Sequence, residues 1–302
     1  MTSEPSVFDE AEFAQRRILG FCEAALERAG VAGVFPTPLR QVIEAAGIAE
    51  ILDISELPTD IPKPRAFSRI LGAVHFRHRT AFIDDSQIRG RVRWTEAHEG
   101  THAILPWHAG QALLDDDESL FKETEEQRER EANIGAAHLV FQGQRFFDRA
   151  LSYEHSIKTP ILLSDDFGAS IHATLRYYAE RHPEPMALAL CGRLRWQSGH
   201  VPIFGTFASP SFRMRFGDPR ALLPDKGMPV EGGAGNDELA AVTDAALSSV
   251  DETACDLRLP DLNGEFRRFR VEAFHNQHSL FVLFTRQRGL VRLGRRIDLK
   301  SS

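Results

Sequence analysis

The 302-residue sequence contains few cysteines and no long apolar stretch. Its three cysteines, Cys22, Cys191 and Cys255, are far apart and never spaced as C-x-x-C, which argues against a disulfide framework or a thiolate metal site. No stretch approaches the roughly 20 apolar residues of a membrane helix, and the N-terminal residues lack the apolar run of a signal peptide. We therefore expect a cytoplasmic protein that does not enter a membrane.

The sequence also lacks an excess of positive charge. Its 36 Lys and Arg residues are outnumbered by 43 Asp and Glu residues, which gives a formal net charge of −7. Sequence-independent binding to nucleic acid depends on many Lys and Arg contacts to phosphates, so this balance argues against direct nucleic-acid binding. A chain of this length normally forms two domains, each large enough to bury a core.

What the sequence does contain is the pattern H-E-x-x-H, at residues 98–102. On a helix, residues i and i+4 project from the same face, so His98 and His102 can bind one metal ion through their imidazole nitrogens. Glu99 can then reach a water molecule on the metal. Zinc lowers the pKa of such a water to about 7, so a neighbouring carboxylate can take its proton at neutral pH. The motif therefore predicts a zinc hydrolase.

A catalytic zinc ion needs a third protein ligand, and two residues compete for this role. Glu131 lies in a largely helical run that follows an acidic connection, whereas His108 would complete the metzincin spacing H-E-x-x-H-x-x-G-x-x-H. The glycine of that spacing is replaced here by Leu105, which cannot easily adopt the positive φ that glycine offers at a helix end. This steric argument favours Glu131, and His108 is then expected behind the ligands or at the surface.

The residues around the motif resemble the ImmA/IrrE family of bacterial zinc metallopeptidases. Three segments carry the resemblance in the same order: residues 93–102, the Glu131-Ala132-Asn133 run with Ala136 and Ala137, and residues 167–176. Departures from the family pattern are Gly100-Thr101 within the motif and Phe141-Gln142 after the second metal helix. The resemblance implies zinc ligands at His98, His102 and Glu131, with Glu99 as general base.

The remaining pattern of residues 1–184 is mixed. Apolar residues at helical spacing predict a helix over residues 8–30 and a shorter one over residues 39–46. Residues 71–76 and 80–84 predict a small hairpin, which we expect to offer an edge strand for an extended peptide. Gly135 could let the second metal helix approach the first closely, and His138 could support a ligand or an oxyanion. The spacing selects no oxyanion donor among Tyr153, His155, His172, Tyr177 and Tyr178.

Paired prolines in residues 182–185 end a helix and predict a domain boundary. After them the pattern predicts strands over residues 187–191, 203–207, 212–216, 254–259, 266–274 and 279–284, and a helix over residues 237–250. This mixture is compatible with the GAF-like sensor domain of some family members. We thus expect an α+β protein with a zincin-like, gluzincin-type domain over residues 1–184 and a regulatory or substrate-docking α+β domain over residues 185–302.

The function that this combination predicts is that of a zinc-dependent endopeptidase. The family resemblance implies that the substrate is a helix-turn-helix transcriptional repressor in a stress-response or mobile-element circuit. The alternative is a metal-binding sensor or regulatory protein that uses a zincin-like fold without hydrolysis. The two hypotheses differ at Glu99, because a protein without chemistry needs no base beside the metal-bound water.

Overall fold

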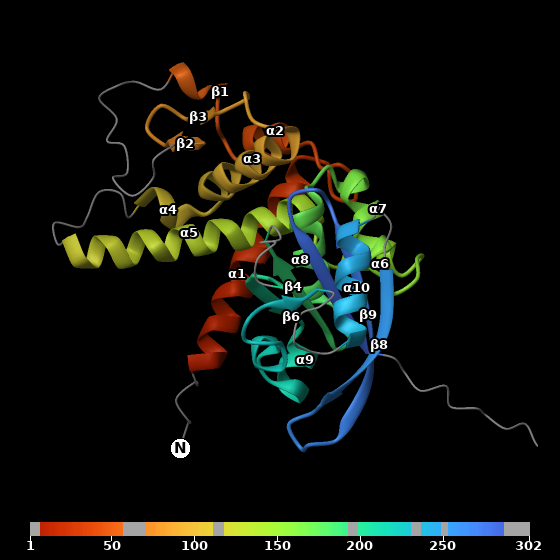
Figure 1. Cartoon of the computed structure of the whole chain (residues 1–302). Helices are drawn as coiled ribbons and strands as arrows, with labels where there is room; N and C mark the ends of the chain where they lie inside the picture. The colour runs from red at the N-terminus through yellow and green to blue at the C-terminus, as the bar shows by residue number, and fades with distance from the viewer. Residues whose placement is uncertain are drawn as a thin grey trace, which may run out of the picture. The chain divides into compact units, whose positions relative to one another are not determined.

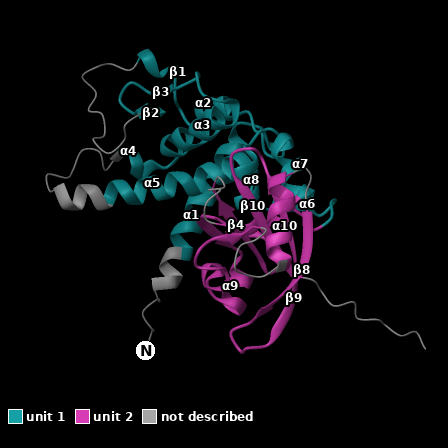
Figure 2. Cartoon of the chain, in the orientation of Figure 1, with its two compact units in different colours: residues 1–154, 158–177 teal, residues 155–157, 178–302 magenta. Residues whose placement is uncertain are grey.

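The computed structural model describes residues 7–56, 71–110, 118–192, 199–230, 237–248 and 253–286 (Figure 1). The chain forms two compact units (Figure 2). Unit 1 contains residues 1–154 and 158–177, and unit 2 contains residues 155–157 and 178–302. The division falls within one helix, between Tyr177 and Tyr178, and a three-residue segment from unit 1's part of the sequence belongs to unit 2. None of the described helices is both long and apolar enough to cross a membrane.

Helices make up most of unit 1. They are α1 (Val7–Arg28), α2 (Leu39–Ala45), α3 (Arg89–Ile104), α4 (Pro106–Gly110), α5 (Glu118–Phe141), α6 (Gln144–Ala150), α7 (Lys158–Phe167) and α8 (Ile171–Arg181), the last of which continues into unit 2. The predicted helices over residues 8–30 and 39–46 are confirmed as α1 and α2. Ile18, Cys22, Ala25 and Leu26 form the buried face of α1, as their helical spacing requires.

A three-stranded sheet accompanies these helices. It consists of β1 (Glu50–Asp53), β2 (Gly72–His75) and β3 (Thr80–Ile83), and a 3-10 helix, Ile54–Glu56, follows β1. The predicted hairpin is confirmed as β2 and β3, which pair antiparallel. The sequence did not predict β1, which pairs parallel to β3 and makes β3 the central strand. β2 is therefore an edge strand of this sheet.

Two glycines allow α3 to pack closely against its neighbours. A Cβ atom on Gly135 of α5 would lie 2.3 Å from Thr101 Cγ2 of α3, so only glycine fits at this contact. The Thr101 hydroxyl donates to the Ala97 carbonyl within α3 at 2.8 Å, which satisfies the buried hydroxyl. On α3, a Cβ atom on Gly100 would lie 3.0 Å from Ile43 Cγ1 of α2. The predicted role of Gly135 in close helix packing is confirmed, and this packing sets the distance between α3 and α5.

Unit 2 is built around a five-stranded antiparallel sheet with the order β6-β4-β10-β9-β8. Its elements after α8 are β4 (Met186–Cys191), β5 (His200–Val201), β6 (Ile203–Ala208), α9 (Pro210–Phe216), a 3-10 helix (Pro219–Leu222), β7 (Met228–Pro229), α10 (Asp237–Ser248), β8 (Thr253–Pro260), β9 (Phe266–His275) and β10 (Leu280–Arg286). Its core includes Phe212, Val242, Phe269 and Val282.

One predicted strand of unit 2 is wrong. Residues 212–216 form helix α9, because Ser209 caps it by accepting from the Phe212 N–H, Pro210 suits its first turn and Gly217 ends it with φ +77°. Phe212 and Phe216 both lie in the core with their ring centroids 5.0 Å apart, while Met214 is 81% exposed. In a strand, all three would face the same side.

Candidate metal centre

Helix α3 places the two motif histidines on one face. The Nε2 atoms of His98 and His102 lie 3.3 Å apart, and the two side chains are 16% and 15% exposed. The pair is therefore largely enclosed but still reachable from solvent. Both rings present the same kind of nitrogen to the same point, as two ligands of one ion would.

Glu129 of α5 completes a three-residue cluster with these histidines. Its Oε2 atom lies 3.2 Å from His98 Nε2, and its Oε1 atom lies 3.5 Å from His102 Nε2. Tetrahedral zinc with ligand bonds of about 2.0–2.2 Å places neighbouring ligand atoms about 3.3–3.6 Å apart. The separation of the two histidine nitrogens matches that value, and one oxygen of Glu129 faces each histidine at a similar distance. One ligand atom from each of the three residues lies within 4.8 Å of the others, and two imidazoles with one carboxylate are a donor set that zinc accepts.

The charges in the cluster support one another. The contacts of its carboxylate with His102 and His98 hold the pKa of Glu129 well below its usual range. Burial works against protonation of His98, but its hydrogen bond to Glu129 and the charges of Glu99 and Glu129 outweigh burial, so the pKa of His98 is raised. Glu129 is consequently ionised near neutral pH, as a carboxylate ligand must be.

Glu99 lies next to this cluster and beneath strand β2. Its residue is 8% exposed, and burial raises the pKa of its carboxyl group. A Cβ atom on Gly72 of β2 would lie 2.8 Å from Glu99 Oε1, which is too close for any side chain. The backbone of β2 therefore packs directly against Glu99. A carboxylate with a raised pKa is a stronger base than one in water, which suits it to accept a proton from a water molecule.

The structure does not bring Glu131 to the histidine cluster. Glu131 Oε2 accepts from Trp107 Nε1 at 2.6 Å and lies 3.0 Å from His108 Nε2. Its other oxygen accepts from Gln127 Nε2 at 2.9 Å. Burial alone would raise the pKa of Glu131, but these three hydrogen bonds outweigh it and lower the pKa. Two residues span about 200° on a helix, so Glu129 and Glu131 leave α5 in nearly opposite directions.

His108 lies behind His102 rather than beside the candidate metal position. Its Nδ1 atom is 2.9 Å from His102 Nδ1, on the side of the ring opposite Nε2. Leu105 has an extended conformation with φ −83°, so the chain makes no glycine-type turn before Pro106 begins α4. His108 is fully buried, and burial lowers its pKa to about 4 although its hydrogen bond to Glu131 opposes this shift.

The remaining candidates have other contacts. His138 Nε2 lies 3.0 Å from Glu23 Oε2, and the same carboxylate accepts from Arg145. The ring of Tyr177 stacks on Phe141 with centroids 4.3 Å apart. His155 and Tyr178 belong to unit 2. These contacts identify no oxyanion donor.

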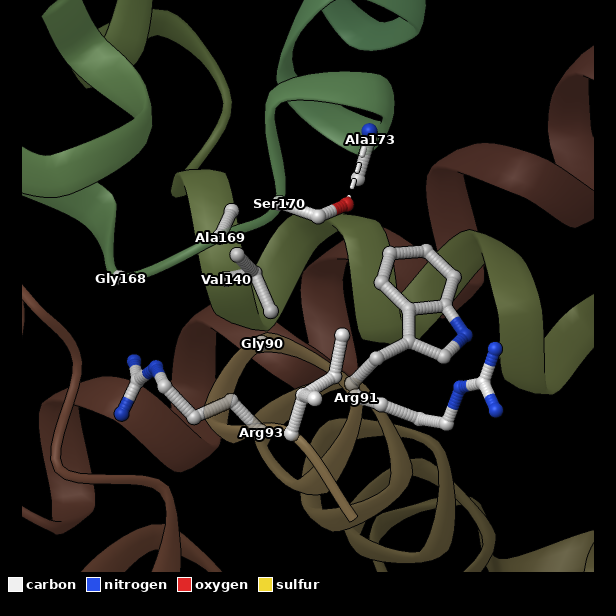
Figure 3. Close-up of a pocket in the computed structure, with 10 residues that line it drawn as sticks. Gly90, Arg91, Arg93, Val140, Gly168, Ala169, Ser170 and Ala173 are labelled. Atoms are coloured by element: carbon white, nitrogen blue, oxygen red, sulfur yellow. Dashed lines mark hydrogen bonds between the residues drawn. The ribbon is translucent and has the colours of Figure 1, made fainter. Parts of the chain in front are cut away.

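A pocket of about 210 Å³ lies between the start of α3, Val140 of α5 and the segment that leads into α8 (Figure 3). Its lining residues are Ile88, Gly90, Arg91, Arg93, Trp94, Val140, Gly168, Ala169, Ser170 and Ala173. Arg91 and Arg93 leave α3 in opposite directions, and Arg93 donates to the Thr37 carbonyl at 2.9 Å. Helical spacing puts Arg91 and Trp94 on the stripe of α3 that carries the motif histidines.

Comparison with known proteins finds a family match over the part of the chain that contains the histidine cluster. Residues 63–176 match the family model described as IrrE N-terminal-like domain (Peptidase_M78). Among solved structures, a Mycobacterium tuberculosis transcriptional regulator is similar with a TM-score of 0.52 and 13% sequence identity, over 89% of this chain and 75% of that one. At this identity the likeness concerns the fold alone. No curated protein matches the sequence. The IrrE N-terminal-like match confirms the resemblance found in the motifs, and residues 63–176 form a domain similar to that of the ImmA/IrrE family.

Proposed function

We propose that this protein is a zinc-dependent endopeptidase in which His98, His102 and Glu129 hold the metal and Glu99 is the general base. The observation that carries the proposal is the cluster of these three residues: the two histidine nitrogens lie 3.3 Å apart, and the Glu129 carboxylate faces them at 3.2 Å and 3.5 Å through its two oxygens, beside the buried carboxyl group of Glu99. The match of residues 63–176 to the IrrE N-terminal-like (Peptidase_M78) model supports a metallopeptidase independently of this geometry. Glu129 replaces Glu131, the third ligand expected from the sequence.

The residues of the site divide the chemistry between them. Zinc, when bound, would lower the pKa of a coordinated water and polarise the carbonyl of the peptide bond. Glu99 would accept a proton from a water molecule at the site and could return it to the leaving amine. Among the described residues β2 is an edge strand, and it lies beside Glu99, so an extended peptide that adds to its outer edge would present a carbonyl to the site. The three-stranded sheet and the two packed metal helices are the arrangement that we assign to a zincin-like domain.

The substrate that we propose is a helix-turn-helix transcriptional repressor in a stress-response or mobile-element circuit. The family and the structural likeness to a transcriptional regulator support a place in gene regulation. We assign unit 2 a regulatory or substrate-docking role, with a GAF-like sensor as the specific hypothesis. The three cysteines carry no disulfide, which supports action in the reducing cytoplasm.

The test combines metal analysis with cleavage of repressors encoded near this gene. Wild-type protein is expected to bind one zinc ion and cleave its substrate. Glu99→Gln should keep the metal and lose cleavage, because the ligands persist while the base is removed. Glu129→Gln should lose both. Undiminished cleavage by Glu99→Gln would exclude the mechanism, and zinc bound without any cleavage by wild type would favour the sensor hypothesis.

A further inference from the structure

We infer that His108 and Glu131 form a positioning pair that determines which ring nitrogen of His102 carries the proton. The pair lies behind the metal cluster and touches it only through His102 Nδ1. The inference rests on the proposed metal site, since a histidine ligand must present a bare nitrogen to the ion. The inference concerns a chain of hydrogen bonds from Glu131 through His108 to His102. The group at the Glu131 end determines which atom donates in each bond.

That end is the Glu131 carboxylate, which can only accept hydrogen bonds when it is ionised. Trp107 Nε1 can only donate, and Gln127 donates through its amide nitrogen, so two of the three partners are donors by chemistry. The third partner, His108 Nε2, lies 3.0 Å from Glu131 Oε2. A ring nitrogen at that distance from a carboxylate must carry the proton. His108 is therefore protonated at Nε2.

The consequence passes through the His108 ring. A neutral imidazole with its proton on Nε2 has a bare Nδ1, and this atom lies 2.9 Å from His102 Nδ1. Two ring nitrogens at this distance share one hydrogen, which His102 must then donate. The proton of His102 therefore resides on Nδ1, and its Nε2 is bare. This is the atom that faces His98 Nε2 and Glu129 Oε1.

Neighbouring residues of α4 and α1 keep His108 and Glu131 in position. Trp107 and His108 are neighbours on α4, so two of the three donors to Glu131 come from one short element. The Trp107 ring packs edge-on against Phe21 with centroids 5.4 Å apart, and Arg17 lies 4.2 Å from its centroid. Both partners belong to α1, so this helix fixes the tryptophan and, through it, the Glu131 carboxylate. Hydrogen-bonded groups behind a ligand typically change metal affinity by about 10- to 100-fold when removed.

The test compares three variants of the full chain by zinc competition with a chelator. His108→Leu removes both hydrogen bonds at similar volume and should weaken zinc binding about 10- to 100-fold. His108→Gln can still accept from His102 and donate to Glu131, so it should recover most of that loss. His138→Gln is the matched control. Like His108, His138 contacts a glutamate carboxylate, but this is Glu23, which is not part of the histidine cluster. It should bind zinc like wild type.

A second readout separates positioning from mere packing. Nitrogen NMR shifts of labelled histidines should show His102 protonated at Nδ1 and His108 at Nε2 in the metal-free protein, and a mixture of His102 tautomers in His108→Leu. Should the leucine variant fail to fold, Glu131→Gln provides the same comparison, with a loss smaller than that of Glu129→Gln.

The outcomes distinguish this inference from the proposed function. A His102 proton on Nε2 in wild type, or unchanged zinc affinity in a folded His108→Leu, would overturn the pair while leaving the metal site intact. Wild-type protein that binds no zinc but shows the stated tautomers would refute the metal site and retain the hydrogen-bond chain.

Discussion

Gly72 is the residue of β2 that lies against Glu99. A Cβ atom there would lie 2.5 Å from Thr95 Cγ2 and 2.8 Å from both Cγ and Oε1 of Glu99. Neither neighbour can move freely, since Thr95 and Glu99 are both buried on α3. The position therefore couples the sheet edge, where a peptide would add, to the proposed base.

We predict that Gly72→Ala lowers the cleavage rate with little change in zinc affinity, because the added methyl group displaces Glu99 or β2 but contacts no ligand. Overpacking of this kind typically costs about 1–3 kcal/mol of stability. Gly20→Ala is the control, since Gly20 lies within α1 with open space around its Cβ position and should gain stability from alanine's helix propensity. Steady-state cleavage and thermal unfolding give the measurements. An alanine variant as active as wild type would show that β2 does not hold the base.

The raised pKa of His98 leads to a prediction about pH. A group whose folded pKa is raised binds its proton at higher pH than usual, and this proton must leave before the nitrogen can bind zinc. Zinc affinity should therefore fall as the pH is lowered through the imidazole range, beginning above the usual histidine pKa of about 6.5, by up to about tenfold per pH unit for each proton released. Glu129 adds nothing in this window, because its pKa lies well below it. A chelator titration with constant affinity across the window would contradict the His98–Glu129 ion pair.

At the scale of elements, the periodicity of the sequence predicted most of the helices and strands but not their partners. Residues 212–216 illustrate the limit, since Phe-Arg-Met-Arg-Phe satisfies both the alternation of a strand and the i, i+4 spacing of a helix. The residues that favour the helix lie outside the segment: Ser209 caps its start and Gly217 ends it. β1 was missed because it is defined by its parallel pairing with β3, which lies far from it in the sequence.

The proposed third ligand, Glu129, shows the same limit within the site. The histidine spacing predicted the 98–102 cluster because both residues share one helix, whereas Glu129 comes from another helix and depends on the rotation of α5. Glu129 and Glu131 flank the buried stripe that contains Ala132 and Ala136, so helical phase alone does not choose between them. The choice depends on how α5 lies on α3, and this tertiary contact leaves no signal in the sequence of α5 alone.

At the scale of the whole molecule, the two units do not separate at the paired prolines of residues 182–185. Residues 155–157 and the end of α8 belong to unit 2, where the buried Glu272 carboxylate accepts from the Ile157 N–H at 3.1 Å. Tyr178 is 1% exposed and also belongs to unit 2. A chain cut after residue 184 would therefore retain side chains whose packing partners are gone, although it retains every proposed ligand.

We predict that such a 1–184 chain binds zinc with wild-type affinity but unfolds at a lower temperature than the full chain. Exposure of a buried aliphatic or aromatic side chain costs about 1.5–3 kcal/mol, and Ile157 and Tyr178 both lose cover. If unit 2 senses a signal, its contacts must favour one state of the peptidase, so cleavage by the short chain should no longer respond to the inducing condition. Zinc retained with no cleavage would instead assign unit 2 to substrate docking. Cleavage that still follows the signal would exclude a sensor role, because no part of unit 2's sheet would remain to report it.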